Sequence, residues 1–326
     1  MKKFSSKIER SLIGIDENKW NICASNKKDY NPFNSYQFLK ALEVSNSINN
    51  DSGWNSAHLI IKDDDQEIIG CVPSYVKTNS SGEYVFDYEW ANAYQRAGGQ
   101  YYPKLQVSIP FTPVTGKRFL INEAYNYDKI FKFISSELMK LCSNIGASSI
   151  HITFLNNLEA EKLRKLGWLI RKDQQFHWKN NNYKSFSSFL ETLSSRKRKN
   201  IKKERLNFIN SEIKIEHLRG DEIKDHHWDS FYNFYLDTTI KKWGQAYLNK
   251  DFFITVGKNM KNNILLIMAK KNNNYIAGAL NFIGENSIYG RNWGCTVDYK
   301  FLHFELCYYQ AIDYAIQNKI KVVEAG

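Results

Sequence analysis

Residues 59–72 read LIIKDDDQEIIGCV, and residues 267–280 read IMAKKNNNYIAGAL. In each stretch three apolar residues precede a lysine, a polar turn follows, and an apolar pair then leads into a glycine. Apolar runs on either side of a turn rich in Asp or Asn predict a β-hairpin. The glycine after the second run predicts a bulge or a close approach of another backbone. The lysine and the glycine have the same spacing in both stretches, so the pattern predicts the same hairpin twice.

The segments that follow the two hairpins also have the same order of predicted elements. An amphipathic helix is predicted at roughly 123–143 in the first copy and 303–317 in the second. Each leads into a short apolar strand, SIHITFL at 149–155 and IKVVEA at 320–325. A helix that leads into a strand of the same sheet is an α/β crossover. Chance similarity of common hairpins is the alternative, but the shared order favours duplication. The predicted fold class is α/β, with mixed sheets in two tandem domains.

The predicted domain boundary lies near residue 180, where WKNNNYKS is polar and turn-like. This gives an N-terminal domain at 1–180 and a C-terminal domain at 181–326. The N-terminal domain carries an insertion at about 87–120, between its hairpin and its helix. This insertion contains three of the five prolines of the chain, Pro103, Pro110 and Pro113.

The composition limits the classes of function. Of the 326 residues, 43% are hydrophobic, enough for substantial cores. The five cysteines are scattered without a CxxC pair, which argues against a disulfide framework or a metal site and is typical of a reducing cytoplasm. No stretch approaches the roughly 18 apolar residues of a membrane span, and the basic N-terminus lacks the apolar region of a signal peptide. We therefore expect a cytoplasmic protein without a transmembrane segment.

The net charge of +11 reflects either diffuse lysine usage or a polyanionic partner. Residues 193–205 read LSSRKRKNIKKER and predict a helix from Ser194 or Ser195 to about Asn210, with a thin apolar stripe of Ile201, Leu206 and Ile209. The helix dipole disfavours cations at a helix start, which points to selection for an anionic ligand. The alternative is a solvated helix, the usual meaning of a charge run. The residues expected to bind phosphates are Arg196, Lys197, Arg198, Lys199 and Lys203.

A strand is predicted at 286–293, NSIYGRNW, in the second half of the chain. Gly290, and Gly294 beyond it, would let another group approach the backbone closely. Arg291 alternates with Trp293, so this pair either holds an anion or a planar ligand, or forms a cation–π pair on a surface strand.

The next segment, FLHFELCYYQAIDYAIQ, predicts a helix. His303 at its start is a candidate general base on an amine, and Glu305 in its first turn is a second acid or base candidate. Capping or core roles are the alternative. No motif for covalent catalysis or nucleotide binding is present, so we expect chemistry by positioning, without a metal or a tightly bound cofactor. The predicted buried face comprises Phe304, Tyr308, Ala311, Ile312 and Ala315.

Several longer blocks resemble a known family. They are WANAYQRAGGQYYPKLQVSIPFTPVTGKR, QFHWKN, LSSRKRKNIKKER, GRNWGC, and LHFELCYYQAIDYAI followed by EAG. They look like signatures of a family related to the GCN5-related N-acetyltransferases (GNAT) and described as peptidoglycan biosynthesis or recognition proteins. The order of elements also resembles the Fem-type aminoacyltransferases, which have a tandem GNAT fold. The resemblance covers nearly the whole chain.

Two departures from these families have consequences. Family members continue past EAG with a segment like AQGEHK, whereas this sequence ends at Gly326, so the resemblance implies a C-terminal domain without its last strands. Acetyltransferases grip the pyrophosphate of CoA with an [RQ]xxGx[GA] loop. The corresponding RNWGCTVDYKFL supplies Arg291 and Gly294, but Thr296 takes the last position. Such a degenerate loop is similar to that of Fem-type enzymes, which use aminoacyl-tRNA.

The resemblance implies an acyl- or aminoacyltransferase that acts on an amine acceptor in peptidoglycan or cell-wall precursor metabolism. The donor would be aminoacyl-tRNA or acyl-CoA, and the chain would associate peripherally with a lipid-linked precursor but not with DNA. Backbone N–H groups near Gly290 would stabilise the oxyanion. One rival is a CoA-dependent N-acetyltransferase of small molecules. The other is a non-catalytic module that recognises peptidoglycan precursors or RNA.

The proline-rich segment is expected to form a rigid wall of the acceptor pocket, because proline fixes φ and withholds N–H groups from sheet pairing. The residues expected in that pocket or at its entrance are Tyr102, Lys104, Phe111 and Thr112. A rigid structural crossover is the alternative. The acyl group, the acceptor and the oligomeric state stay open.

Overall fold

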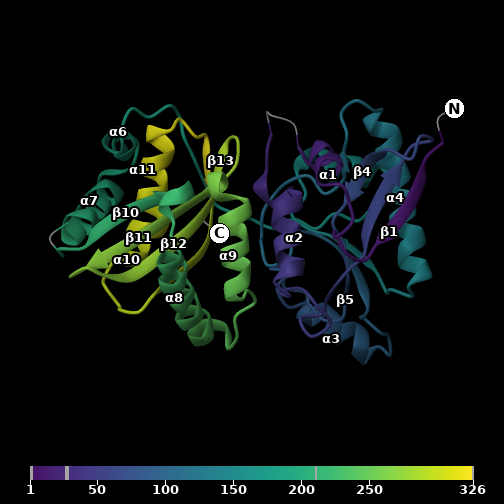
Figure 1. Cartoon of the computed structure of the whole chain (residues 1–326), viewed down its shortest axis with the longest axis horizontal. Helices are drawn as coiled ribbons and strands as arrows, with labels where there is room; N and C mark the ends of the chain where they lie inside the picture. The colour runs from purple at the N-terminus through teal and green to yellow at the C-terminus, as the bar shows by residue number, and fades with distance from the viewer. Residues whose placement is uncertain (1–2, 26–28, 210, 325–326) are drawn as a thin grey trace. The chain divides into compact units, whose positions relative to one another are not determined.

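The computed structural model describes residues 3–25, 29–209 and 211–324. The chain divides into two compact units, Met1–Asp173 (unit 1) and Gln174–Gly326 (unit 2), each of which packs helices against β-sheet (Figure 1). The division precedes the predicted boundary near 180. The reason is that His177–Lys179 pairs with β14 of unit 2, although the polar sequence around it is typical of a linker.

The described part of unit 1 forms two four-stranded sheets, ordered β1-β3-β4-β7 and β2-β5-β6-β8. Its strands are β1 (Ser5–Glu9), β2 (Trp54–Ser56), β3 (His58–Lys62), β4 (Ile68–Val72), β5 (Ser74–Lys77), β6 (Lys104–Val107), β7 (Leu120–Ile121) and β8 (Ile150–Ile152). Its α-helices are α1 (Glu17–Ala24), α2 (Tyr36–Val44), α3 (Tyr88–Arg96), α4 (Tyr127–Asn144) and α5 (Asn157–Lys165).

Unit 2 forms one six-stranded sheet in its described part, ordered β10-β11-β12-β13-β14-β9. The strands are β9 (His177–Lys179), β10 (Lys214–Arg219), β11 (Ile264–Lys271), β12 (Asn274–Ile283), β13 (Ser287–Cys295) and β14 (Val322–Glu324). The helices are α6 (Phe186–Glu191), α7 (Ser195–Ile209), α8 (Asp225–Trp243), α9 (Lys250–Asn259), α10 (Leu302–Phe304), a π-helix (Glu305–Tyr309) and α11 (Gln310–Gln317). The predicted end of the last strand at residue 325 lies outside the described residues.

Both predicted hairpins are confirmed. Strand β3 pairs with β4, and β11 pairs with β12, each in antiparallel fashion. Asn272 and Asn273 join the second pair with φ of 48° and 63°, the positive values that a two-residue type I′ turn requires. In each hairpin the register shifts directly before the predicted lysine. At Gly278 a side chain approaches closely and not the backbone that was expected, because a Cβ atom there would lie 2.8 Å from Sδ of Met268.

The two copies differ in where the crossover strand lies. In unit 2, α11 leads to β14, which pairs in parallel with β13 of the hairpin's own sheet. In unit 1, α4 leads to β8, which pairs with β6 in the second sheet, so the predicted crossover into the hairpin's own sheet is wrong there. Because β6 lies within the predicted insertion at 87–120, that segment is partly a sheet strand. The chain enters the second sheet after Pro73, whose missing N–H interrupts the ladder.

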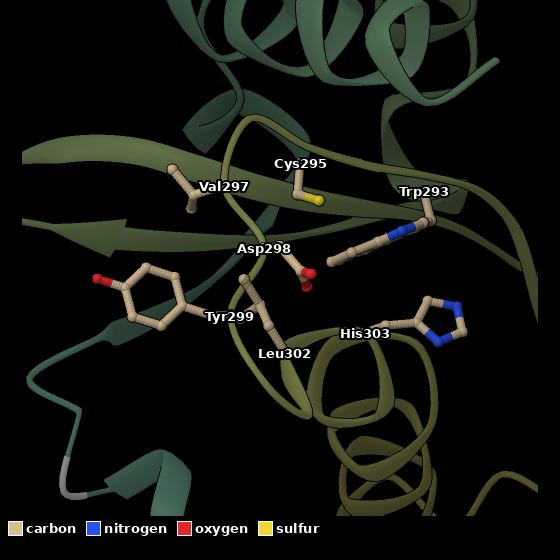
Figure 2. A pocket seen from close by; sticks show the side chains of 7 residues that line it. All are labelled: Trp293, Cys295, Val297, Asp298, Tyr299, Leu302 and His303. Atoms are coloured by element: carbon tan, nitrogen blue, oxygen red, sulfur yellow. The ribbon is translucent and has the colours of Figure 1, made fainter. Parts of the chain in front are cut away.

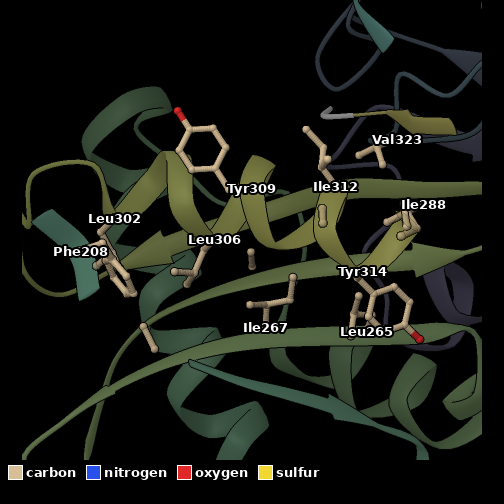
Figure 3. Close-up of a cluster of buried hydrophobic side chains, with 14 of the residues drawn as sticks. Phe208, Leu265, Ile267, Ile288, Leu302, Leu306, Tyr309, Ile312, Tyr314 and Val323 are labelled. Carbon is tan, nitrogen blue, oxygen red and sulfur yellow. The ribbon is translucent and has the colours of Figure 1, made fainter. Parts of the chain in front are cut away.

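The helix after β13 departs from regular α-helical geometry. Its π-helix widens one turn and places Leu302, Leu306 and Tyr309 over the sheet of unit 2 (Figure 3). The predicted buried face is therefore wrong at Phe304, which is 48% exposed, because the extra residue in the turn shifts the face. Beyond the π-helix the prediction is confirmed for Ala311, Ile312 and Ala315.

The basic helix is confirmed as α7, but its buried face differs from the predicted stripe. Ile201 packs against the core, whereas Leu206 is 58% exposed and Phe208 only 7%. Phe208 thus supplies the main apolar anchor of α7. The side chain of Ile209 and residue Asn210 lie outside what the structure describes.

Truncation of Phe208 to alanine should lower the free energy of unfolding by about 3 kcal/mol or more, because a buried aromatic ring is lost and a cavity remains. Leu206→Ala on the same helix is the matched control and should change it by less than about 0.5 kcal/mol, because the side chain is largely in water. Urea denaturation of both variants measures the difference. Equal losses would mean that α7 is anchored by its other face.

Candidate functional site

Unit 2 contains a pocket of about 230 Å³ between the end of β13 and the start of α10. Its lining consists of Trp293, Cys295, Val297, Asp298, Tyr299, Leu302 and His303. Figure 2 shows the carboxylate of Asp298 and the rings of Trp293 and His303 around the same space. An acidic group, an imidazole and an indole thus share one small concave site, an arrangement that suits an amine-bearing ligand.

The irregular course of β13 positions the strand side of this pocket. Asn281 pairs with Gly290 while Leu280 pairs with Asn292, so Arg291 is an extra residue that bulges from the ladder. Such bulges re-aim the side chains that follow them. Trp293 and Cys295 follow this bulge along β13 and line the pocket.

Gly294 fixes the same part of β13 against α8. A Cβ atom at this position would lie 2.0 Å from the carbonyl oxygen of Phe234, so only glycine fits. The group that approaches Gly294 closely, as the sequence predicted, is thus the backbone of a helix of the same unit.

His303 lies at the mouth of the site, where α10 begins. Its ring centroid lies 5.2 Å from that of Trp293 and 5.6 Å from that of Tyr308, both in edge-to-face geometry. Tyr299 accepts a hydrogen bond from Nζ of Lys271 at 2.6 Å. Burial raises the pKa of the Cys295 thiol, which keeps it in the protonated, unreactive form. His303 supplies the imidazole among the residues that line this pocket.

Glu305, the second predicted acid or base, does not line the pocket. Its side chain is buried, and Oε1 accepts hydrogen bonds from Nη2 of Arg205 on α7 at 3.1 Å and from Nε2 of Gln310 on α11 at 2.7 Å. On the same helices the hydroxyl of Tyr309 donates to Glu204. Glu305 is thus a link between α7 and the π-helix, and the structure separates it from His303.

Of the other two side chains predicted on β13, one lines the pocket and the other does not. Trp293 lines the pocket. Nη2 of Arg291 donates a hydrogen bond to Oε2 of Glu324 at 3.0 Å, and Nη1 donates to the carbonyl of Gly290 at 2.7 Å. The guanidinium group also lies over the ring of Tyr289. Its charge is therefore compensated inside unit 2 by a carboxylate that the sequence alone did not connect to it.

The cationic residues of α7 form an outward surface of unit 2. Arg196, Lys197, Lys199 and Lys203 are exposed, and Arg198 is half-buried with Nη1 at 3.4 Å from the carbonyl of Glu191. Arg196, Lys199 and Lys203 are spaced by three and four residues, which places them on one side of the helix. We call these three residues the basic stripe.

The residues predicted from the proline-rich segment all lie in unit 1 and not at an open entrance. Lys104 is fully buried, and the hydroxyl of Tyr102 lies 2.7 Å from Oγ of Ser80. Phe111 has a positive φ of 57° and packs on Trp54, and Thr112 is buried beside it. Lys104, Phe111 and Thr112 are thus buried inside unit 1, and Tyr102 is half-buried.

Asp298 is the acidic pocket residue that sequence reasoning missed. It lies in VDYK, directly after the strand, in the loop that corresponds to the CoA-binding loop of acetyltransferases. A carboxylate in that loop is the sequence signal that could have identified it as a site residue. Across the described residues no helix is long and apolar enough to cross a membrane. Nor do those residues bring three His, Cys, Asp or Glu side chains together in a metal-binding group.

Comparison with known proteins agrees with the resemblance seen in the sequence blocks. A family model named FemAB-like, described as peptidoglycan biosynthesis/recognition, matches residues 11–326. Among solved structures, FemX superposes with a TM-score of 0.57 at 10% identity, over 95% of this chain and 87% of that one. No curated protein matches by sequence.

Two other solved structures have the same fold. The L-PGS structure from Bacillus licheniformis gives a TM-score of 0.51 at 7% identity, over 92% of this chain and 77% of that one. The C-terminal domain of a putative lysylphosphatidylglycerol synthetase from Agrobacterium fabrum gives 0.52 at 6%, over 94% and 76%. These likenesses confirm the predicted α/β fold class with two tandem units.

Proposed function

This chain belongs to the FemAB-like family of peptidoglycan biosynthesis or recognition proteins, and on that premise we propose that unit 2 transfers an aminoacyl group from aminoacyl-tRNA to a primary amine. The pocket formed by Asp298, Trp293 and His303 is the observation that carries this proposal. The acceptor is a peptidoglycan precursor, in line with the family description. The precursor reaches the chain free or linked to lipid, and the reaction takes place in the cytoplasm.

The pocket supplies what an amine acceptor needs. The carboxylate of Asp298 attracts the ammonium form of the acceptor into the site, and the imidazole of His303 removes its proton. The free amine then attacks the ester carbonyl of the donor, an amide C–N bond forms and the ester C–O bond breaks. The ribose oxygen leaves as a hydroxyl group after it takes up a proton. In this proposal, backbone N–H groups near the bulge of β13 stabilise the developing oxyanion.

The distribution of charge favours tRNA over CoA as the donor. In the loop that resembles the CoA-binding loop of acetyltransferases, Gly294 packs on α8 and Asp298 places a negative charge in the pocket. A pyrophosphate would be repelled there. The basic stripe of α7, in contrast, offers three exposed cations to a phosphate backbone.

A thermal-shift comparison tests the choice of donor. At a hundred times its dissociation constant a ligand stabilises the folded state by about 2.7 kcal/mol. We expect a rise in melting temperature with aminoacyl-tRNA and none with acetyl-CoA. A rise with acetyl-CoA alone would identify a CoA-dependent acetyltransferase. Binding of tRNA without turnover would identify a recognition module.

Replacement of His303 by alanine should lower kcat by about 10²–10⁴-fold, the usual contribution of a general base. The melting temperature should stay within a degree or two of the parent, because His303 is exposed. His177→Ala, at an exposed site on β9, is the matched control and should retain full activity. If His303→Ala kept the parental rate, solvent rather than His303 would take the proton.

A further inference from the structure

The second sheet of unit 1 has an unusual buried face. Leu105 and Val107 of β6 belong to the apolar core on one side of the sheet. On the other side Lys104 and Gln106 of β6 lie opposite Lys77 and Tyr75 of β5, and all four side chains are fully buried. A sheet normally turns its polar residues to water. Here residues 78–103, which run from β5 to β6 and include α3, cover the polar side.

The covering segment supplies two carboxylates to this face. Nζ of Lys104 lies 2.8 Å from Oε2 of Glu83 and 2.5 Å from Oδ2 of Asp87. The hydroxyl of Tyr101 donates to the same Asp87 oxygen at 2.8 Å. Nζ of Lys77 donates to the carbonyl of Ser81 at 3.2 Å and lies over the ring of Trp54. Two carboxylates and two lysines are therefore enclosed together.

Several oxygens on this face lack a hydrogen-bond partner although they are buried. Three of them can only accept: Oε1 of Glu83, Oδ1 of Asp87 and Oε1 of Gln106. The buried hydroxyls of Tyr75 and Ser108 also lack a hydrogen-bond partner. Each such group costs about 1–3 kcal/mol, and folded proteins satisfy nearly all of them. Unsatisfied acceptor oxygens on two carboxylates and one amide of the same buried face point to a ligand with several N–H donors.

We propose that this face of unit 1 is a binding site for a primary ammonium group, held by Glu83 and Asp87 and closed by residues 82–99 as a lid. Lys104 shows the geometry that the two carboxylates offer to an ammonium group, and their second oxygens are still available. The inference does not depend on aminoacyl transfer by unit 2, because it is tested by measuring ligand binding to unit 1 and not by measuring activity.

The charge of the site depends on Lys77. Burial lowers the pKa of Lys77 to about 7, so that above this pH Lys104 is the one cation beside the carboxyl groups of Glu83 and Asp87. Burial also raises the pKa of the Glu83 carboxyl, an effect that the charge and hydrogen bond of Lys104 oppose. The remaining negative charge accommodates one ammonium group. His151 on β8 lies 3.9 Å from Asp87, and burial lowers its pKa to about 4, so it stays neutral. The neighbouring tyrosines have raised pKa values and are neutral as well.

The lid has glycines at both ends. Gly82 and Gly98 adopt positive φ of 74° and 84°. Glycine adopts such φ values without the strain that a Cβ atom would add, and at Gly82 a Cβ atom would also lie 2.4 Å from the ring of Phe111. Between them, α3 turns Trp90 outward with 68% of its surface exposed, and Phe86 just before α3 is 69% exposed. The segment thus contacts the sheet through its acidic residues while its large apolar groups stay outside the core.

The test uses n-butylamine as the probe and ligand-observed NMR on the full chain. An alkylamine keeps its proton up to about pH 10. We expect binding to be about tenfold tighter at pH 8 than at pH 6, because Lys77 must lose its proton first. n-Butyltrimethylammonium, which has the charge but no N–H donor, and propionate should not bind. Failure of the amine to bind, or binding of propionate instead, would overturn the proposal.

Two variants locate the site. Lys77→Met removes the competing charge and should bind n-butylamine at pH 6 as tightly as at pH 8, an outcome that a purely structural lysine would not give. Glu83→Gln should weaken binding at least tenfold, whereas Glu89→Gln on the exposed side of α3 is the control and should not. If Glu83→Gln does not fold, the pH dependence of Lys77→Met still decides. Binding by the parent that is the same at pH 6 and pH 8 would contradict the assigned site.

Discussion

Reversal of the basic stripe, Arg196→Glu, Lys199→Glu and Lys203→Glu together, is expected to weaken binding of aminoacyl-tRNA by roughly 10²–10³-fold at 0.1 M salt. The three side chains are exposed on one side of α7, where each can neutralise one phosphate and release its counterion. Nitrocellulose filter binding over a series of salt concentrations measures the loss. The slope of log K against log salt should become shallower by about 2–3, the contribution of three lost contacts.

The control for this experiment keeps the change in net charge and moves it elsewhere. Lys129, Lys132 and Lys165 are exposed on the helices of unit 1, and their replacement by glutamate lowers the net charge by the same amount. We expect this variant to bind tRNA within a few-fold of the parent. Equal losses in the two variants would mean that overall charge, and not the stripe, attracts the polyanion.

Replacement of Gly294 by alanine is expected to lower the free energy of unfolding by about 3 kcal/mol or more, at the upper end of what overpacking costs. The added Cβ would meet the carbonyl oxygen of Phe234 at 2.0 Å, and backbone atoms of a packed helix cannot turn aside as a side chain can. Because β13 carries Trp293 and Cys295 into the pocket, activity should fall with stability. Urea denaturation measures the change.

Gly220→Ala provides the comparison. A Cβ atom there meets nothing within 4 Å, so only its positive φ of 53° opposes the substitution, at about 1 kcal/mol. If Gly294→Ala cost no more than Gly220→Ala, α8 would have room to move away from β13. The pocket would then be less rigid than the structure indicates.

The hairpins could be predicted because their determinants are local. A turn of Asn272 and Asn273 between two apolar runs has few other solutions, and the same holds for the Asp-rich turn in unit 1. The burial of Lys104 could not be predicted in the same way. Its partners Glu83 and Asp87 lie in a segment whose course depends on the whole unit, so the sequence presents an isolated lysine beside prolines.

The candidate site was predicted in part for a similar reason. His303 and Trp293 were identified because a strand end and a helix start are visible in the sequence pattern. The π-helix was not visible, since it changes the helical period over one turn only, and it moved Phe304 outward and Glu305 inward toward Arg205. Asp298 was missed because it lies in an irregular loop, where no periodicity marks the direction of a side chain.

The most direct test of the account is a transfer assay with labelled donors. The purified chain is incubated with labelled aminoacyl-tRNA or labelled acetyl-CoA and a soluble peptidoglycan precursor that carries a free primary amine, and label in the amide product is counted. We predict product from aminoacyl-tRNA, a loss of at least a hundredfold with His303→Ala, and none from acetyl-CoA. Product from acetyl-CoA alone, or turnover that does not depend on His303, would contradict the account.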